Sequence, residues 1–229
     1  MADAYFSMAT FDFLDRLADN NRREWFQEHR AEYEGCVRSP ALKLIADVAQ
    51  ELPQLSPHFL AIPKKVGGSL MRVYRDTRFA KDKTPFKTNI GIQLRHNMGK
   101  DAHAPCYYLH ISPSECFLGA GVWCPDGPSL GKIRDRIAER EQEWLKARDH
   151  KPFKKGYRLG GELLKTSPRG FSRDHPMIED LRRKSFIAIQ DLAPDLITSR
   201  QLKKEIMKRY ALATPYMRFL CNALEVPFD

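Results

Sequence analysis

The chain has 229 residues and a mass of 26.5 kDa, with 42% hydrophobic residues, 29% charged residues and a formal net charge of +9 at pH 7. This composition is ordinary for a globular protein and excludes wholesale disorder. No apolar run approaches the ~18 residues needed to cross a bilayer, and the first residues do not have the pattern of a secretory signal. We therefore expect a cytoplasmic protein without a membrane partner, folded as a single domain over residues 1–229.

The N-terminal part of the chain, residues 8–55, has the apolar periodicity of helices. Thr10 is expected to cap a first helix, and Asn21 followed by Glu24 three residues later resembles a capping box before a second. After Pro40, apolar residues again recur at helical spacing until a proline-rich stretch ends the pattern.

From residue 69 to 124 the apolar pattern changes to a period of two, which predicts strands. The turn at residues 112–115 sets the register of the last two strands as a hairpin, in which His110 faces Phe117 and Tyr108 faces Gly119. One face of the sheet is then apolar, whereas the other mixes polar, aromatic and glycine residues. The glycines leave space above this second face, so it is either a ligand pocket or a surface in contact with water. The four expected strands are 69–76, 89–96, 106–111 and 116–124.

Residues 129–226 again favour helices. Ser129 is expected to cap one helix, Asp174 to begin a second that reaches Ile189, and Thr198 or Ser199 to begin a third. Helices at both ends of the chain would flank a central, mainly antiparallel sheet of at least four strands. This arrangement is an α+β fold.

The five cysteines are an odd number and include no C-x-x-C pair, so neither a disulfide framework nor a zinc ribbon is indicated. Cys106 and His110 are the closest approach to a metal-ligand pair, but free cysteine is mostly a small buried hydrophobe, and we expect no metal. The familiar phosphate-binding, dinucleotide-binding and hydrolase motifs are absent, and the sequence indicates no cofactor.

The densest functional signal is a basic segment, residues 72–87, which holds six Lys and Arg residues against two Asp residues, with three aromatic residues between them. Arginine forks and lysine ammonium groups suit phosphate and carboxylate oxygens, so the segment predicts an anion site. The alternative is that the arginines pair with Asp76 and Asp82 inside the protein while the lysines remain in water. The residues expected to bind the ligand are Arg72, Arg75, Arg78, Lys81, Lys83, Lys87, Arg95 and Tyr108.

Several motifs accompany the basic segment, which reads RVYRDTRF and, after one alanine, KDKTPFK. They are NNRREWF at 20–26, YYLHI at 107–111 with GAG at 119–121, and LLKTSPRGF at 163–171. Together these motifs resemble the family called domain of unknown function 2461, over nearly the whole chain. The resemblance implies one domain from about residue 8 to 226 and supplies no catalytic residue.

These features predict a protein that binds an anionic, phosphorylated ligand beside the basic segment. The partner would be a phosphorylated small molecule or, weakly and without sequence preference, nucleic acid. Two alternatives remain open. The basic segment could dock an acidic partner, or the protein could be a phosphate-ester enzyme in which His110 acts as general acid or base, because an imidazole titrates near pH 6.5.

Overall fold

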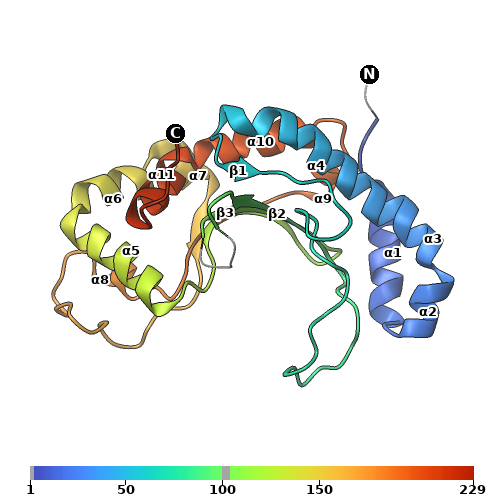
Figure 1. Cartoon of the computed structure of the whole chain (residues 1–229), viewed down its shortest axis with the longest axis horizontal. Helices are drawn as coiled ribbons and strands as arrows, with labels where there is room; N and C mark the ends of the chain where they lie inside the picture. Colours follow the sequence, from blue (N-terminus) through green and yellow to red (C-terminus); the bar gives the residue numbers. More distant parts are fainter. Residues whose placement is uncertain (1–2, 100–103) are drawn as a thin grey trace.

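The computed structural model describes residues 3–99 and 104–229 and contains a six-stranded antiparallel sheet in the order β1-β2-β3-β4-β6-β5 (Figure 1). This confirms the α+β class. Among the described residues, helices lie above the sheet and to both sides of it in Figure 1, and its lower face is open. The strands are β1 (Phe59–Leu60), β2 (Ile90–His96), β3 (Cys106–Ile111), β4 (Cys116–Val122), β5 (Arg158–Gly160) and β6 (Phe186–Asp191).

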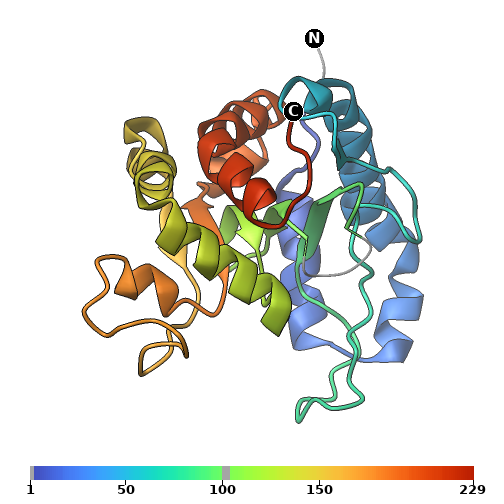
Figure 2. The ribbon, with the colours of Figure 1, turned by 60° about the vertical axis from the view of Figure 1, so that its left-hand side comes forward.

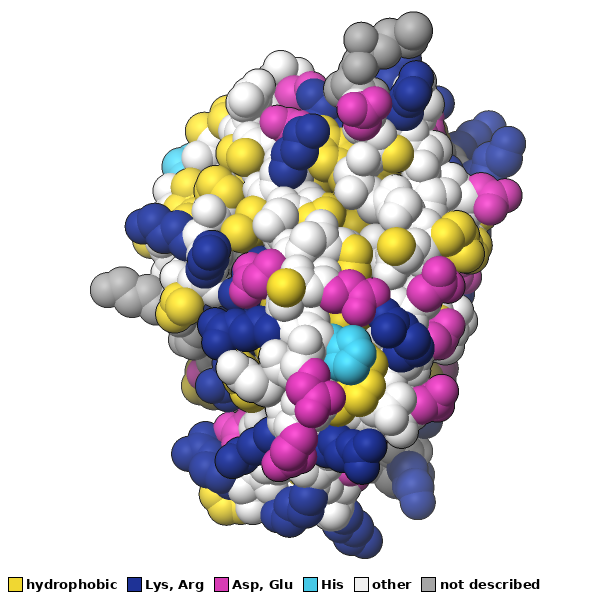
Figure 3. Space-filling view, turned by 90° about the vertical axis from the view of Figure 1, so that its right-hand side faces the viewer, with side chains coloured by type: hydrophobic (Ala, Val, Ile, Leu, Met, Phe, Trp, Pro, Cys, Tyr) yellow, Lys and Arg dark blue, Asp and Glu magenta, His cyan; other side chains and the backbone are white. Residues whose placement is uncertain are grey.

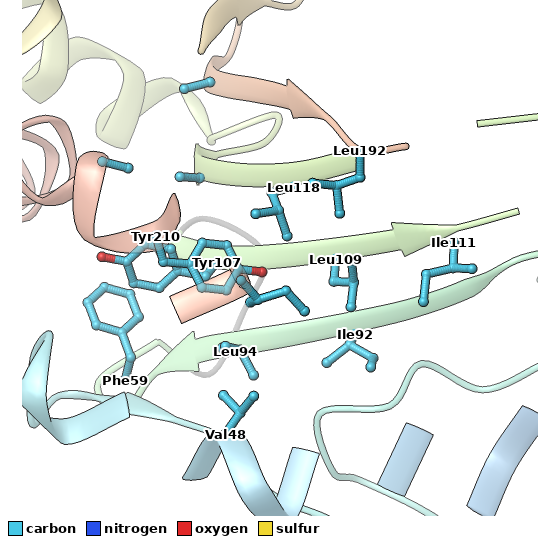
Figure 4. Packing of buried hydrophobic residues seen from close by; sticks show 14 of the residues in the cluster. Val48, Phe59, Ile92, Leu94, Tyr107, Leu109, Ile111, Leu118, Leu192 and Tyr210 are labelled. Atoms are coloured by element: carbon cyan, nitrogen blue, oxygen red, sulfur yellow. The ribbon is translucent and has the colours of Figure 1, made fainter. Parts of the chain in front are cut away.

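The hairpin of β3 and β4 has the predicted register, with His110 opposite Phe117 and Tyr108 opposite Gly119. Alternate residues of these strands therefore point into the core. Figure 4 shows Leu109 and other apolar residues of the covered face packed together, with the helices contributing side chains such as Tyr210. The alternation predicted from the sequence is confirmed for every core residue on β2, β3 and β4.

The N-terminal helices form as expected, but two of their predicted caps are wrong. Ser7 occupies the cap position of the first helix, and its N–H donates to Thr10 Oγ1 at 3.3 Å, so Thr10 already lies inside the helix. The side chain of Asn21 instead forms two hydrogen bonds of 3.0 Å with the backbone of Phe86. It thereby ties the second helix to the end of the basic segment. The helical elements here are α1 (Met8–Asp19), α2 (Arg23–Glu28), α3 (Arg30–Tyr33), η1 (Glu34–Arg38), α4 (Ser39–Glu51) and η2 (Leu52–Gln54).

The strand expected over residues 69–76 does not form. Its start makes an isolated bridge between Leu70 and Ile92 at the edge of β2, and the chain then leaves the sheet. It pairs with its own returning part, because the N–H of Arg75 donates to the Pro85 carbonyl at 2.9 Å and the N–H of Lys87 to the Val73 carbonyl at 2.7 Å. Residues 72–87 therefore form a projecting loop, which we call the basic arm; it extends below the sheet in Figure 1.

The helix expected from Asp174 to Ile189 is also absent. Only α8 (Ile178–Leu181) is helical in this stretch, and β6 pairs with β4 through Val122 and Phe186. Side chains of β6 alternate between the two faces of the sheet, which suits a strand in its interior. Residues 129–226 thus contribute two strands that the sequence analysis assigned to helices.

The other C-terminal helices are present with shifted starts. Asp126 rather than Ser129 caps α5, accepting a hydrogen bond from the Ser129 N–H at 2.8 Å, and α10 begins at Leu202. Figure 2 shows α11 lying against α5, and α11 also contacts α6. These helices are α5 (Gly127–Glu139), α6 (Glu141–Arg148), α7 (Lys151–Gly156), α9 (Pro194–Ile197), α10 (Leu202–Leu212) and α11 (Thr214–Ala223).

Candidate ligand-binding site

The open face of the sheet carries a cavity of about 370 Å³, which we call the cup. It lies on the face that the sequence predicted to be either a ligand pocket or a surface in contact with water. Its walls are mainly apolar and aromatic, and they come from four neighbouring strands and from the two chain segments that flank them. The lining residues are Met71, Gln93, Cys106, Tyr108, His110, Phe117, Gly119, Ala120, Gly121, Trp123, Ile187 and Ile189.

Two glycines of β4 form the floor of the cup, between larger residues on β3 and β6. Gly119 lies between Tyr108 and Ile189 in the sheet, and a Cβ atom there would meet only Tyr108, at 3.4 Å or more. Gly121 has a φ of +130°, and a Cβ atom would lie 2.0 Å from the carbonyl oxygen of Phe186. The space above Gly119 is therefore available to a ligand. At Gly121, by contrast, the backbone conformation and the close approach of β6 require a glycine.

One end of the cup carries a cluster of neutral polar groups. The hydroxyl of Tyr108 donates to His110 Nδ1 over 3.3 Å, and Asn89 Nδ2 lies 3.5 Å from the same atom. The imidazole stacks on Phe117 with ring centres 4.7 Å apart. Burial lowers the pKa of His110, and nearby Glu115 opposes this only in part. Burial therefore favours the neutral ring, whose Nδ1 can accept a hydrogen bond from the Tyr108 hydroxyl or the Asn89 amide.

The other end of the cup contains Gln93 and Cys106. The amide of Gln93 donates to Cys106 Sγ at 3.3 Å and accepts from Arg95 Nε at 2.9 Å. Burial raises the pKa of Cys106, which keeps it a thiol. Arg95, one of the expected ligand residues, thus lies at the rim of the cup with one hydrogen bond already made.

Most charges in the middle of the basic arm are paired with one another. Arg78 binds the Asp76 carboxylate through Nε at 3.0 Å and Nη2 at 2.7 Å, and Arg75 binds Asp82. The Arg78 side chain holds the pKa of Asp76 down to about 2, and bonds from the Thr84 N–H and from Arg75 do the same for Asp82. This is the ion-pair arrangement that the sequence left as the alternative. Lys83 donates to a backbone carbonyl of the arm, that of Thr77, at 2.8 Å.

The side chains of three cations of the basic arm, Arg72, Lys81 and Lys87, make no hydrogen bond or ion pair with residues 3–99 or 104–229, although the charge of Arg72 contributes to the lowered pKa of Asp76. Lys87 is half-buried, and its pKa is lowered first by burial and then by the charge of Arg72. Arg72 directly follows Met71, which lines the cup. Arg72 and Lys87 thus lie close together at the root of the arm, where the chain leaves the lining residue Met71, whereas Lys81 lies in the exposed outer part; neither Arg72 nor Lys87 is itself among the lining residues of the cup.

Of the expected ligand residues, Tyr108 lines the cup, Arg95 is bonded to the lining residue Gln93, and Arg72 directly follows the lining residue Met71. The others belong to the arm: Arg75, Arg78, Lys81, Lys83 and Lys87. Sequence analysis missed the lining residues on β6, because their segment was assigned to a helix; the alternation of Phe186 to Ile189 was the available signal. The alternation expected over residues 69–76 would put Met71 on the apolar core face of the sheet, which is wrong: this side chain is 38% exposed and lines the cup.

Within residues 3–99 and 104–229, no three His, Cys, Asp or Glu side chains converge as a metal site would require. No helix in that part of the chain combines the length and apolar character needed to cross a membrane.

The fold and the cup define an α+β protein with an open antiparallel sheet and a cavity on its exposed face. The chain belongs to the family of conserved hypothetical proteins DUF2461, whose model matches residues 9–219. No curated protein and no solved structure matches the chain.

Proposed function

We propose that this protein binds an organic anion whose ring or apolar body lies in the cup and whose phosphate or carboxylate lies beside Arg72 and Lys87. The observation that supports this proposal is a mainly apolar cavity together with two neighbouring cations, Arg72 and Lys87, whose side chains form no ion pair with the described residues. Neither feature is explained by packing of the fold.

The size and lining of the cup favour one ring system. Ligand pockets usually span about 300–1,000 Å³, and a cavity of about 370 Å³ lies at the small end of that range. Phe117, Tyr108 and Trp123 supply aromatic surface around the glycine floor, and aromatic rings pack favourably against one another. Tyr108 and His110 add hydrogen-bonding groups that would orient a polar substituent.

The charges at the root of the arm favour an anion. Burying Lys87 next to Arg72 disfavours its charged form, as its lowered pKa shows, and a phosphate or carboxylate between the two groups would reverse that penalty. Arginine provides the planar fork that binds such oxygens in pairs.

The test compares three compounds by isothermal titration calorimetry: 1-naphthyl phosphate, 1-naphthol and inorganic phosphate. The first has both ring and charge, and the others have one feature each. We expect 1-naphthyl phosphate to bind the most tightly. Release of 1-naphthol, followed by fluorescence, would instead indicate the phosphate-ester activity that His110 could support, and His110→Asn would then abolish it.

Variants separate the two parts of the site. Lys87→Met should lower the affinity for 1-naphthyl phosphate by about tenfold or more, because a hydrogen bond to a charged group contributes roughly 1.5–3 kcal/mol. The affinity for 1-naphthol should not change. Gly119→Leu should lower the affinity for both compounds, because the leucine side chain would occupy the space above the floor of the cup. Lys81→Gln, in the outer part of the arm, is the control and should affect neither. Equal affinity for 1-naphthyl phosphate and inorganic phosphate would contradict the proposal.

A further inference from the structure

We infer that the cup and the basic arm together bind single-stranded nucleic acid, with one base in the cup and another stacked on Phe79 of the arm. This inference rests on the proposed function, because it takes the organic anion to be one nucleotide of a longer chain. It adds a second contact region, the outer part of the arm, that the cup alone does not use.

Exposed aromatic side chains gather at the cup and the arm. Of the aromatic residues in 3–99 and 104–229, only Tyr74, Phe79 and Trp123 are strongly exposed, at 52%, 95% and 58%. Tyr74 and Phe79 belong to the arm, and Trp123 lines the cup. Single exposed apolar residues are normal on a protein surface, but aromatic rings exposed both on the arm and at the cup give each of the two regions a surface on which a base can stack.

The arm is built to hold Phe79 outward. Asp76 and Arg78 form a two-point ion pair directly before it, and Lys83 bonds to the Thr77 carbonyl across the loop. The Arg78 guanidinium lies 5.9 Å from the centre of the Phe79 ring. The exposure of this ring is thus part of a braced local structure, which leaves the face of the ring that is turned away from Arg78 free for stacking.

Positive charge accompanies these rings. The arm has six cations and two acids, a net charge of +4. Lys81 is unpaired near Phe79, as Arg72 and Lys87 are at the root of the arm near the cup. In the face shown in Figure 3, Lys and Arg side chains gather at the lower end, where the arm and the turn between α1 and α2 lie.

A single strand fits this pattern better than other polyanions. Proteins bind single strands by stacking bases on aromatic rings and holding phosphates with Lys and Arg, whatever the sequence. Bases in a duplex are stacked on each other, so they could neither enter the cup nor stack on the face of Phe79. An anionic membrane would be met by two acids, Asp76 and Asp82, beside a single projecting ring, and an acidic protein would leave the cup unused.

The experiment measures fluorescence anisotropy of a labelled twelve-residue oligothymidylate with the full chain between 50 and 200 mM salt. Three unpaired cations predict that the logarithm of the affinity falls with the logarithm of salt with a slope of about −2, at about −0.7 per phosphate contact. Phe79→Ala should lower the affinity about tenfold without changing this slope. The matched control is Val66→Ala, at another loop residue that is 88% exposed.

Competition identifies the partner class. A duplex of the same length, inorganic polyphosphate, poly-glutamate and phosphatidylserine vesicles should each compete at least tenfold less well than the unlabelled oligonucleotide. Equal competition by polyphosphate or poly-glutamate, or an unchanged affinity in Phe79→Ala, would overturn the inference in favour of an acidic partner. Equal competition by the vesicles would overturn it in favour of a membrane surface. If the oligonucleotide does not bind but 1-naphthyl phosphate does, only this inference fails; if neither binds, the proposed function fails as well.

Discussion

Exchanging each floor glycine of the cup for alanine tests the geometry of the site directly, because the two positions should respond in opposite ways. At Gly121 the φ of +130° is one that L-residues rarely adopt, and the new Cβ atom would lie 2.0 Å from the Phe186 carbonyl oxygen. At Gly119 the Cβ atom would meet only Tyr108 at ordinary contact distance. Strain should therefore dominate at the first position and reduced chain entropy of the unfolded state at the second.

The expected magnitudes follow from these distances. A residue forced into such a backbone conformation costs on the order of 1–3 kcal/mol, and the clash with β6 must be relieved as well, so Gly121→Ala should lose about 3 kcal/mol or more of unfolding free energy. For a chain of this length each kcal/mol shifts the melting temperature by about 2–4 °C, which predicts a fall of about 6–12 °C. Gly119→Ala should change stability by no more than about 1 kcal/mol, with a gain expected.

Thermal unfolding followed by circular dichroism, with urea unfolding as a second measure, gives both values. The geometry of the floor would be refuted if Gly121→Ala melted within about 2 °C of the parent, or if Gly119→Ala lost as much stability as Gly121→Ala. The first result would mean that β4 and β6 do not approach each other as the structure shows, and the second that the space above Gly119, beside Tyr108, is not open.

Three further predictions concern the core, the basic arm and a buried histidine. Leu109→Ala should lower the unfolding free energy by about 2–5 kcal/mol in urea titrations, because Leu109 is a core residue of the central hairpin; a loss below about 1 kcal/mol would place it outside the core. Arg75→Gln should loosen the arm and speed amide hydrogen exchange at Thr84, whose N–H binds Asp82 at 2.9 Å; unchanged exchange would show that the ion pair does not order the arm. The neutral ring of His96 donates to the Pro227 carbonyl at 2.7 Å, and burial lowers its pKa below 6.5, so the unfolded chain takes up the proton more readily. Stability should therefore fall as the pH drops from 6.5 through this lowered pKa, and His96→Gln should reduce that dependence relative to the parent in unfolding experiments between pH 7.5 and 5.

The central hairpin could be predicted in full from the sequence. A turn with Pro113 at its first central position fixes the pairing of the residues on either side, and a shift by one residue would turn every apolar side chain to the wrong face. The turn residues and the apolar pattern favour the same pairing there. The observed register, in which Ile111 faces Cys116, is the predicted one.

The errors arose where distant residues decide the structure. The alternating segment that begins at Ser69 has the pattern of a strand, yet the Asn21 amide holds the backbone of Phe86 and the arm pairs with itself. At the other end, Asp174 and the proline two residues after it favoured a helix start, but only one short helical turn follows before β6 enters the sheet beside β4. Neither contact is visible in the local sequence.

The ion-pair interpretation of the basic segment holds for Arg75 and Arg78, and the anion-site interpretation stays a prediction for the other cations. The arm contains two acids, and Arg75 and Arg78 bind them, so these arginines serve to shape the arm. The surplus charge therefore belongs to the remaining cations, of which Arg72 and Lys87 lie close together at the root of the arm. Counting charges in the sequence gives the excess of positive charge in the arm. It cannot show which cations remain unpaired, because ion pairing depends on how the loop folds. Substitutions at the root of the arm should therefore change the affinity for a ligand most. Substitutions in the middle of the arm should mainly change the stability of the arm.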